Sequence, residues 1–245
     1  MPTVILTHLG RTRYADAWEL QHRLWDARCG GAVGDLLLFT EHEHVYTLGR
    51  SGDENHLLAS ADELKARGAE FFPIDRGGDI TYHGPGQVVG YPILDLNGFT
   101  PDLHRYLRSL EETIILALRD FGISAGREEG MTGVWVGGEK IAAIGVRVSR
   151  WVTMHGFALN VNTDLTMFDR IIPCGIFHKG VTSMQRLLGR TVPLQDVEAS
   201  LSRAFAQVFA CELTSVPAGQ LMETLKTTSE TATAVPVESG LQRSE

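Results

Sequence analysis

The chain is poor in cysteine and has no long apolar run. It contains three cysteines in 245 residues, and none of them is spaced as C-x-x-C, which argues against both a disulfide framework and a thiolate zinc site. No apolar stretch approaches the ~20 residues that a membrane-spanning helix needs. The N-terminal residues also lack the basic region and apolar stretch of a secretory signal. We therefore expect a cytoplasmic protein with reduced thiols and no membrane partner.

Positive charge is also scarce. The chain has 22 Lys and Arg against 30 Asp and Glu, and its formal net charge is −8. Sequence-independent binding of nucleic acid needs a concentrated basic surface that neutralises phosphates. We therefore expect no nucleic-acid partner, and any acidic protein partner must meet a local basic patch.

The length and the 43% hydrophobic content are ordinary for one mixed α and β domain. Beyond about Gln220 the composition turns to Thr, Ser, Glu and Ala, with few large apolar residues. Such a segment cannot bury enough surface to offset the entropy of ordering it. We predict a single domain over residues 1–218 and a disordered tail over residues 219–245.

Apolar periodicity predicts the main helices and strands. The expected helices cover residues 14–28, 60–68, 100–121 and 193–208, with a short helical stretch near Met167, and the expected strands cover residues 36–39, 134–136, 141–148 and 156–162. Ser60 and Glu63 have the spacing of a capping box. Gly137 and Gly138 have the composition of a hairpin turn between two of the strands.

A long glycine-rich motif runs from Arg76 to Gln87, with the sequence RGGDITYHGPGQ. Two adjacent glycines, a β-prone segment and a Gly-Pro-Gly sequence describe a backbone that passes close to something and turns sharply. From spacing alone, a tight hairpin without a ligand and a loop that cradles a substrate are equally compatible with this motif.

Lys140 follows the predicted hairpin turn. Most lysines in such turns are solvated surface residues. Strand alternation, however, places Lys140 on the same face as Ala142, Ile144, Val146 and Val148, and Arg147 on the opposite face. Partial desolvation at the mouth of that apolar face would lower the pKa of the ammonium, as a lysine acting as a base or thiol partner requires.

Cys174 lies between a proline and a glycine, outside any apolar-periodic element. A thiol in such a loop is accessible, whereas Cys29 and Cys211 have the setting of small buried hydrophobes. A nearby cation or base would stabilise the Cys174 thiolate and make it a nucleophile. An unreactive loop thiol remains the alternative.

Nine histidines raise the question of a metal site. His42 and His44 form the densest group, but they lack an identifiable third and fourth ligand and the chain has no H-E-x-x-H, so we interpret them as a surface or turn cluster. His83 and His155 each precede a glycine and are either proton shuttles or structural histidines. The chain also has no G-x-x-x-x-G-K-[ST] loop. We expect neither a metal nor another cofactor.

Several segments together resemble a known family. They are Thr47–Arg50, Arg76–Gln87, Tyr91–Pro92, Gly138–Ala142, His155–Asn162, Pro173–Gly175 and Val181–Ser183. In this order they are similar to motifs of the bacterial LipB family of octanoyltransferases, or lipoyl(octanoyl) transferases, over about residues 5–210. The resemblance implies an α+β fold like that of biotin and lipoate ligases, with one domain, a mixed and mainly antiparallel sheet and flanking helices.

The resemblance also implies an activity and a site. It implies transfer of an octanoyl group from octanoyl-acyl carrier protein to a lysine of lipoyl domains, in 2-oxoacid dehydrogenase complexes and the glycine cleavage H protein. Cys174 would carry the acyl group as a thioester, and Lys140 would lower the pKa of the Cys174 thiol. The implied substrate contacts are Arg76, Gly77, Gly78, Asp79, Ile80, Thr81, Tyr82, His83, Ala143, Ile144, Gly145, Gly156, Phe157 and Ala158.

Two rival functions stay open at this point. An ATP-dependent lipoate or biotin protein ligase of the same fold would activate a free acid. A binding or hydrolase module could use Cys174 with His83 or His155. For docking of the acidic carrier, the basic residues nearest the site in sequence are Arg147, Arg150, Lys179 and Arg186. We expect the chain to act as a monomer.

Overall fold

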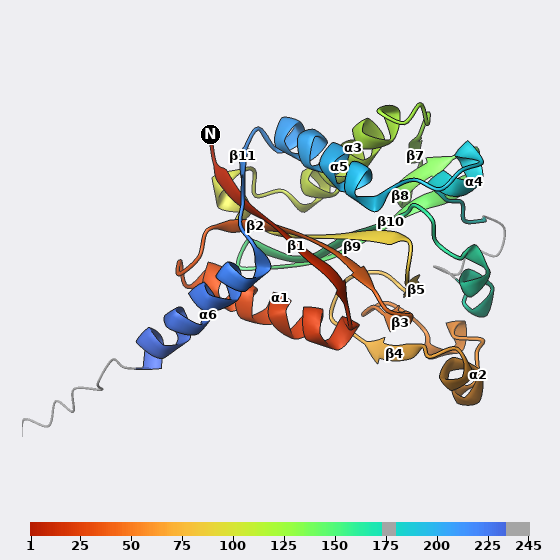
Figure 1. The fold of residues 1–245 in the computed structure, drawn as a ribbon, viewed down its shortest axis with the longest axis horizontal. Coiled ribbons are helices and arrows are strands. Elements are labelled where there is room, and N and C mark those ends of the chain that lie inside the picture. The colour runs from red at the N-terminus through yellow and green to blue at the C-terminus, as the bar shows by residue number, and fades with distance from the viewer. Residues whose placement is uncertain (173–179, 234–245) are drawn as a thin grey trace, which may run out of the picture.

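The computed structural model describes residues 1–172 and 180–233, the last six of them by their backbone alone (Figure 1). The helices are α1 (Tyr14–Cys29), α2 (Ala61–Ala66), α3 (Leu103–Arg119), α4 (Met184–Leu188), α5 (Leu194–Phe209) and α6 (Ala218–Thr233), with 3-10 turns η1 (Glu54–His56), η2 (Leu96–Gly98) and η3 (Leu165–Arg170). The strands are β1 (Thr3–Thr12), β2 (Asp35–His42), β3 (Val45–Leu48), β4 (Glu70–Pro73), β5 (Ile80–His83), β6 (Gln87–Ile93), β7 (Gly126–Glu128), β8 (Met131–Val136), β9 (Glu139–Ser149), β10 (Val152–Asn160) and β11 (Glu212–Ser215).

Eight of the strands form one large sheet in the order β11-β1-β2-β6-β10-β9-β8-β7. Strand β1 pairs in parallel with β11 and β2, and the other neighbouring pairs are antiparallel. The predicted α+β class with a mixed, mainly antiparallel sheet is therefore confirmed. A second sheet, β4-β3-β5, lies at one end of the large sheet together with α2 (Figure 1).

Helices cover both faces of the large sheet. Helices α3 and α5 lie on one face, and α1 and α6 lie on the other (Figure 1). The first face carries a core that includes Leu110, Ile114 and Leu201, and the second a core that includes Leu24 and Leu36. The apolar stripe predicted for residues 100–121 buries Leu110, Ile114 and Leu118, whereas Leu103 at its start is exposed. Helix α3 begins after Asp102, whose side chain accepts a hydrogen bond from the Arg105 amide.

The hairpin of β8 and β9 forms where the sequence predicts it. Gly137 and Gly138 both have positive φ, 57° and 83°, the conformation that a two-residue hairpin turn requires. Along β9, Ile144, Val146 and Val148 pack against the first core. Arg147 instead stacks on Trp25 of α1, on the other side of the sheet. The predicted alternation is thus confirmed for this part of the strand.

The structure differs from the prediction of a tail without structure. Helix α6 spans Ala218–Thr233, and Leu221 and Leu225 are buried against the second core. The two leucines are four residues apart and lie on one face of the helix. The mainly polar helix α6 therefore packs on the sheet, because its two apolar side chains on one face contact the second core. Residues 234–245 of the predicted tail lie outside the described residues.

Within the described ranges, no helix combines the length and the apolar character needed to cross a membrane.

Candidate active site

A cavity of about 510 Å³ lies between strands β9 and β10 and the segment from Arg76 to His83. That volume falls within the range of small-ligand pockets, roughly 300–1,000 Å³. At one end it is lined by exposed residues, among them Leu103 at the start of α3, Gly130 and Thr132. At the other end it is lined by the buried side chains of Tyr14, Tyr91, and His155. The cavity therefore runs from a mouth near α3 and β8 to an enclosed inner end.

The cavity brings together residues that are far apart in the sequence. Of the predicted substrate contacts, those that line it are Arg76, Gly77, Gly78, Asp79, Ile80, Thr81, His83, Ala143, Ile144, Gly145, Gly156, Phe157 and Ala158. Tyr82 is the exception. Its side chain is fully buried in the core of the small sheet, and its hydroxyl bonds to Nδ1 of His44 at 2.7 Å. Tyr82 lies on the face of β5 opposite Thr81 and His83, because successive side chains of a strand alternate; Ile80 shares the face of Tyr82 but sits at the start of the strand, where it reaches the cavity.

The glycine-rich segment packs directly on strand β9. The Gly77 amide donates to the Val146 carbonyl at 2.9 Å, and a Cβ on Gly145 would come within 2.9 Å of Cδ of Arg76. The buried Arg76 guanidinium donates to the carbonyl and the hydroxyl of Thr47 on β3, at 2.8 and 3.1 Å. Arg76 thus ties the small sheet to the large one, and glycine at position 145 permits the close approach.

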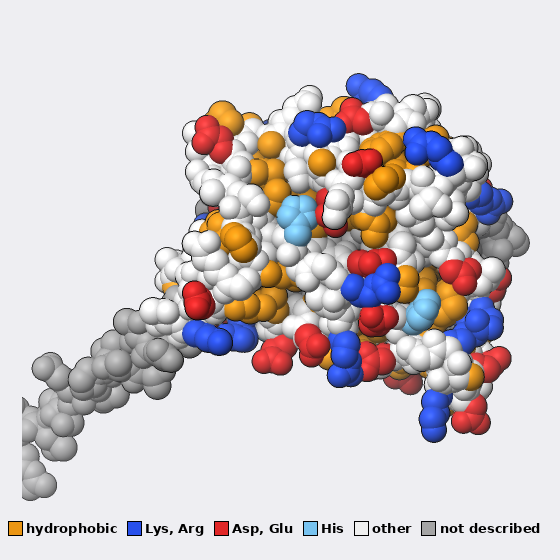
Figure 2. Space-filling view, viewed as in Figure 1, with side chains coloured by type: hydrophobic (Ala, Val, Ile, Leu, Met, Phe, Trp, Pro, Cys, Tyr) orange, Lys and Arg blue, Asp and Glu red, His pale blue; other side chains and the backbone are white. Residues whose placement is uncertain are grey.

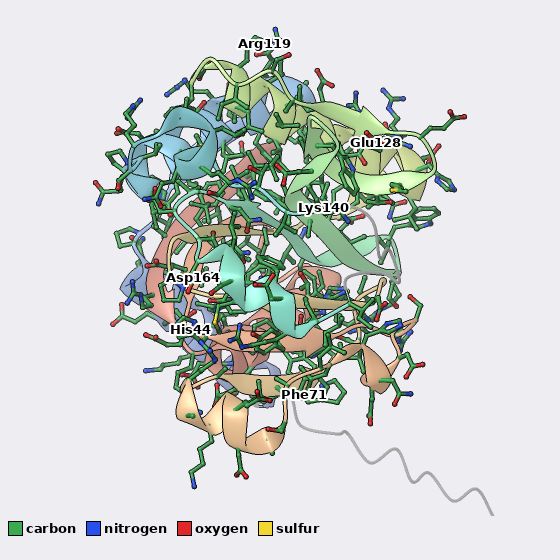
Figure 3. The ribbon with its side chains drawn as sticks, turned by 90° about the vertical axis from the view of Figure 1, so that its right-hand side faces the viewer. His44, Phe71, Arg119, Glu128, Lys140 and Asp164 are labelled. Carbon is green, nitrogen blue, oxygen red and sulfur yellow. The ribbon has the colours of Figure 1, made fainter. Side chains whose placement is uncertain are left out.

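Lys140 lies on the side of the molecule that faces the viewer in Figure 3, between Glu128 and Asp164 in that view. Its side chain lines the cavity, and Nζ lies 4.8 Å from the centroid of the Trp135 ring. Its amide donates to the Gly180 carbonyl at 2.9 Å, and its carbonyl accepts from the Thr182 amide at 3.0 Å. The backbone of Lys140 is thus held on both sides by the strand-like segment that begins at Gly180.

Cys174 lies in residues 173–179, outside the described residues. The described residue that follows this segment, Gly180, is the one bonded to Lys140. The roles predicted for Cys174 and Lys140 stay predictions.

His83 is held as a neutral imidazole with a defined tautomer. The side-chain nitrogen of Gln87, Nε2, donates to the Tyr82 carbonyl and to Oδ1 of Asn160, at 3.2 and 2.9 Å. The side-chain oxygen of Gln87 must therefore accept from Nδ1 of His83, at 2.8 Å. Burial, and to a smaller extent the neighbouring His42, lowers the pKa of His83 to about 3. At neutral pH the proton is on Nδ1, and Nε2 is the basic nitrogen.

His155 is held differently. It has a positive φ of 60° within β10, a conformation that costs a non-glycine residue about 1–3 kcal/mol. Its Nε2 lies 2.8 Å from Asp75, whose other oxygen accepts from Arg147 at 2.7 Å. Burial lowers the pKa of His155, although Asp75 opposes the shift. Asp75 and its partner arginine thus orient a neutral imidazole at the cavity wall.

The interpretation of His42 and His44 as a surface or turn cluster is wrong for His42. Its side chain is fully buried, its Nε2 lies 2.7 Å from the Tyr91 hydroxyl, and burial lowers its pKa to about 4. His42 lies at the end of strand β2, which is buried along almost its whole length. In the part of the chain that the structure describes, no group of three or more His, Cys, Asp or Glu side chains could hold a metal.

The basic residues expected to receive an acidic partner do not form one patch. The guanidinium groups of Arg147 and Arg150 lie over the Trp25 ring, at 4.9 and 4.6 Å. Arg186 instead lies 3.5 Å from Glu139, eight residues along β9 from Arg147, or about 26 Å at the rise of a strand. Lys179 lies outside the described residues. On the face shown in Figure 2, Lys and Arg side chains are dispersed among Asp and Glu.

Comparison with solved structures supports the fold. A bi-partite lipoate protein ligase from Thermoplasma acidophilum superposes with a TM-score of 0.69 over 100% of this chain and 99% of its own, at 19% identity. A lipoate-protein ligase A bound with ATP superposes with a TM-score of 0.71 over 94% of each chain, at 18% identity. At such identities the likeness concerns the fold alone, and it confirms the expected relation to lipoate ligases.

Comparison with curated sequences is closer. An octanoyltransferase from Flavobacterium johnsoniae is 51% identical over 85% of this chain and 97% of its own length. One from Solibacter usitatus is 54% identical over 87% of this chain and 96% of its own. The model of the lipoyl protein ligase A/B catalytic domain matches residues 13–206. The chain therefore belongs to the lipoyl protein ligase A/B catalytic domain family, in which these relatives are octanoyltransferases.

Proposed function

We propose that this protein is an acyltransferase that moves an octanoyl group from octanoyl-acyl carrier protein to a lysine of lipoyl domains, through a thioester on Cys174. The observation that carries the proposal is the 51–54% identity to octanoyltransferases over at least 85% of the chain. The specific donor and acceptors belong to the proposal. We also propose that the protein acts as a monomer and is located in the cytoplasm.

The cavity suits an acyl chain. Ala143, Ile144, Val146, Phe157 and Ala158 supply an apolar wall from β9 and β10. Lys140 lines the cavity alongside them, and Leu103 lies partly exposed at the mouth. An eight-carbon chain has seven carbon–carbon bonds of about 1.5 Å and is therefore at most roughly 11 Å long, which is shorter than the roughly 16 Å between Lys140 and Gly145 along β9.

Two acyl transfers follow from these groups. In the first, the Cys174 thiolate attacks the carbonyl carbon of the donor thioester, the carbon–sulfur bond to the carrier breaks, and the carrier thiolate takes the proton of the Lys140 ammonium and leaves as a thiol, so that Lys140 becomes neutral. In the second, the acceptor amine attacks the enzyme thioester, an amide forms, Cys174 leaves as a thiolate, and the amine proton passes to Lys140. Two easier steps replace one difficult step.

The roles of the inner histidines follow from their protonation. His83 and His155 are neutral because burial lowers the pKa of each. Neutral rings add no charge beside an apolar chain, so the inner end of the cavity can accept methylene groups without burying an unpaired cation. His83 is stacked on Tyr14 with the two rings nearly parallel. We assign these rings to the wall of the acyl site.

The alternative is an ATP-dependent ligase, which the likeness of fold to lipoate ligases favours. Nucleotide and donor dependence separate the two functions. With octanoyl-acyl carrier protein, a chelator and no ATP, we expect transfer to a lipoyl domain at the full rate. A strict need for ATP, with free octanoate as the usable donor, would show that the protein is a ligase.

A further inference from the structure

A buried carboxylate lies behind Lys140 and takes no part in the mechanism above. Glu111 is on α3, within a helix face that otherwise buries apolar side chains, and it is only 1% exposed. A buried carboxylate requires charged or polar partners. The partners of Glu111 are the side chains of Arg108 and Arg127, at 2.7 and 2.9 Å, and the amide of Gly133 on β8, at 3.1 Å.

The contact with Gly133 is the informative one. The two arginines reach Oε2 from partly exposed positions, with 53% and 35% of their side chains exposed. Oε1 instead accepts from a buried backbone amide on β8, the strand beside the edge strand β7 of the large sheet. A carboxylate that accepts a backbone amide makes a strong, directional bond. Glu111 therefore fixes the position of β8 at this residue.

Gly133 in turn lies against the side chain of Lys140. Its φ is 130°, and a Cβ built on it would lie 2.8 Å from the Ala142 carbonyl oxygen and 3.3 Å from Cε of Lys140. The lysine stem thus occupies the space that the missing side chain leaves. Any displacement of Gly133 is transmitted to Lys140 by direct contact.

A bulge occurs at the same place. Val134 pairs with Ala142, but the next residue, Trp135, pairs with Lys140, so Ile141 is an extra residue on β9. A bulge of this kind changes the direction of the neighbouring side chains and is common beside active sites. Here Nζ of Lys140 comes to lie over the Trp135 ring. Gly133 directly precedes the bulge, and the bond from its amide to Glu111 holds this part of β8 in place.

We infer that Glu111 is a positioning residue for Lys140, acting through the amide of Gly133 and the bulge between β8 and β9. The inference rests on the proposed function, in which Lys140 favours the thiolate of Cys174. Glu111 touches neither substrate nor thiol. Its effect therefore disappears when Lys140 is absent, whereas a merely structural carboxylate would affect the enzyme with or without the lysine.

The test measures how fast iodoacetamide alkylates Cys174 as a function of pH, followed by the mass of the Cys174 peptide, in folded variants checked by thermal melting. We expect Glu111→Ala to alkylate roughly tenfold more slowly at pH 7, as for a thiol pKa raised by about one unit. Glu111→Gln keeps an acceptor for the Gly133 amide and should retain most of the rate. Glu112→Ala is the matched control, because Glu112 also bonds Arg127, at 2.7 Å, and it should match the parent.

The double variant Glu111→Ala with Lys140→Ala should alkylate as Lys140→Ala does alone. A parent rate for Glu111→Ala, or additive losses in the double variant, would overturn the inference and leave the proposed function intact. A parent rate for Lys140→Ala would instead overturn the lysine's role and the inference with it. If Glu111→Ala does not fold, Glu111→Asp carries the test: it keeps a carboxylate near Arg108 and Arg127 but draws the acceptor back from the Gly133 amide by one methylene group, so it should slow alkylation in the same way, and a parent rate would overturn the inference.

Discussion

Buried histidines near the inner end of the cavity make the stability of the protein depend on pH. His42 titrates at about 4 in the folded chain because burial disfavours its charged form, against about 6.5 when unfolded. Between these values the unfolded chain binds more protons than the folded one. The contribution of neutral His42 is therefore fully present above pH 6.5 and is lost as the pH falls toward 4. His83 acts in the same direction.

We expect the free energy of unfolding to fall by about 2 kcal/mol for His42 between pH 7 and pH 5. His42→Gln should remove that part of the loss, as measured by urea unfolding at the two pH values. His104→Gln, at an exposed position on α3, is the control and should show the parent's dependence. An equal pH dependence in the parent and in His42→Gln would contradict the assignment of His42 as a buried neutral group.

Among the elements, α6 makes the most direct prediction. Leu221 and Leu225 are its two described side chains that are fully buried against the second core. Burial of a leucine stabilises a protein by about 1.5–3 kcal/mol. A chain truncated after residue 217 should therefore lose about 3–6 kcal/mol of unfolding free energy. A chain truncated after residue 233 should keep the parent value.

Thermal and urea unfolding of the two truncated chains check this prediction. Leu221→Ala with Leu225→Ala in the full chain should reproduce most of the loss, which separates the packing of the helix from its length. Equal stability of all three variants and the parent would mean that α6 does not dock in solution.

Sequence patterns predicted those elements whose signal is local. The capping box of Ser60 and Glu63, the turn glycines 137 and 138, and the apolar stripe of α3 each depend on residues within a few positions of one another. The bulge at Ile141 is different, because it follows from how β8 and β9 pair. The residues of one strand alone do not specify how it pairs with the other.

The same limit applies to the site. All of the predicted substrate contacts except Tyr82 line the cavity. They were found because the family resemblance identifies positions that are distant in the sequence and close in the fold. Glu111 was missed, since a single acidic residue in an amphipathic helix is ordinarily solvated. The burial of His42 was missed for a similar reason. Both depend on partners more than 20 residues away, Gly133 and Tyr91.

In the molecule as a whole, the junction of the two sheets forms the cavity, and Lys140 lines it. The small sheet and the large sheet meet at Arg76 and Gly77: Arg76 bonds Thr47 on β3, and the Gly77 amide bonds Val146 on β9. The cavity that forms there lies between β9, β10 and the glycine-rich segment. Lys140 is fixed in the same sheet by Gly180 and Thr182. This arrangement offers an acyl chain the apolar wall that the proposed transfer requires.

The central claim is that an octanoyl group passes through Cys174. The most direct measurement is the mass of the intact protein and of its Cys174 peptide after incubation with octanoyl-acyl carrier protein, followed by addition of a lipoyl domain. We predict one octanoyl group on Cys174, absent in Cys174→Ala, which disappears as the lipoyl domain gains the same mass on a lysine. Octanoylation of the lipoyl domain by Cys174→Ala at the parent rate, with no adduct on the parent enzyme, would contradict the account.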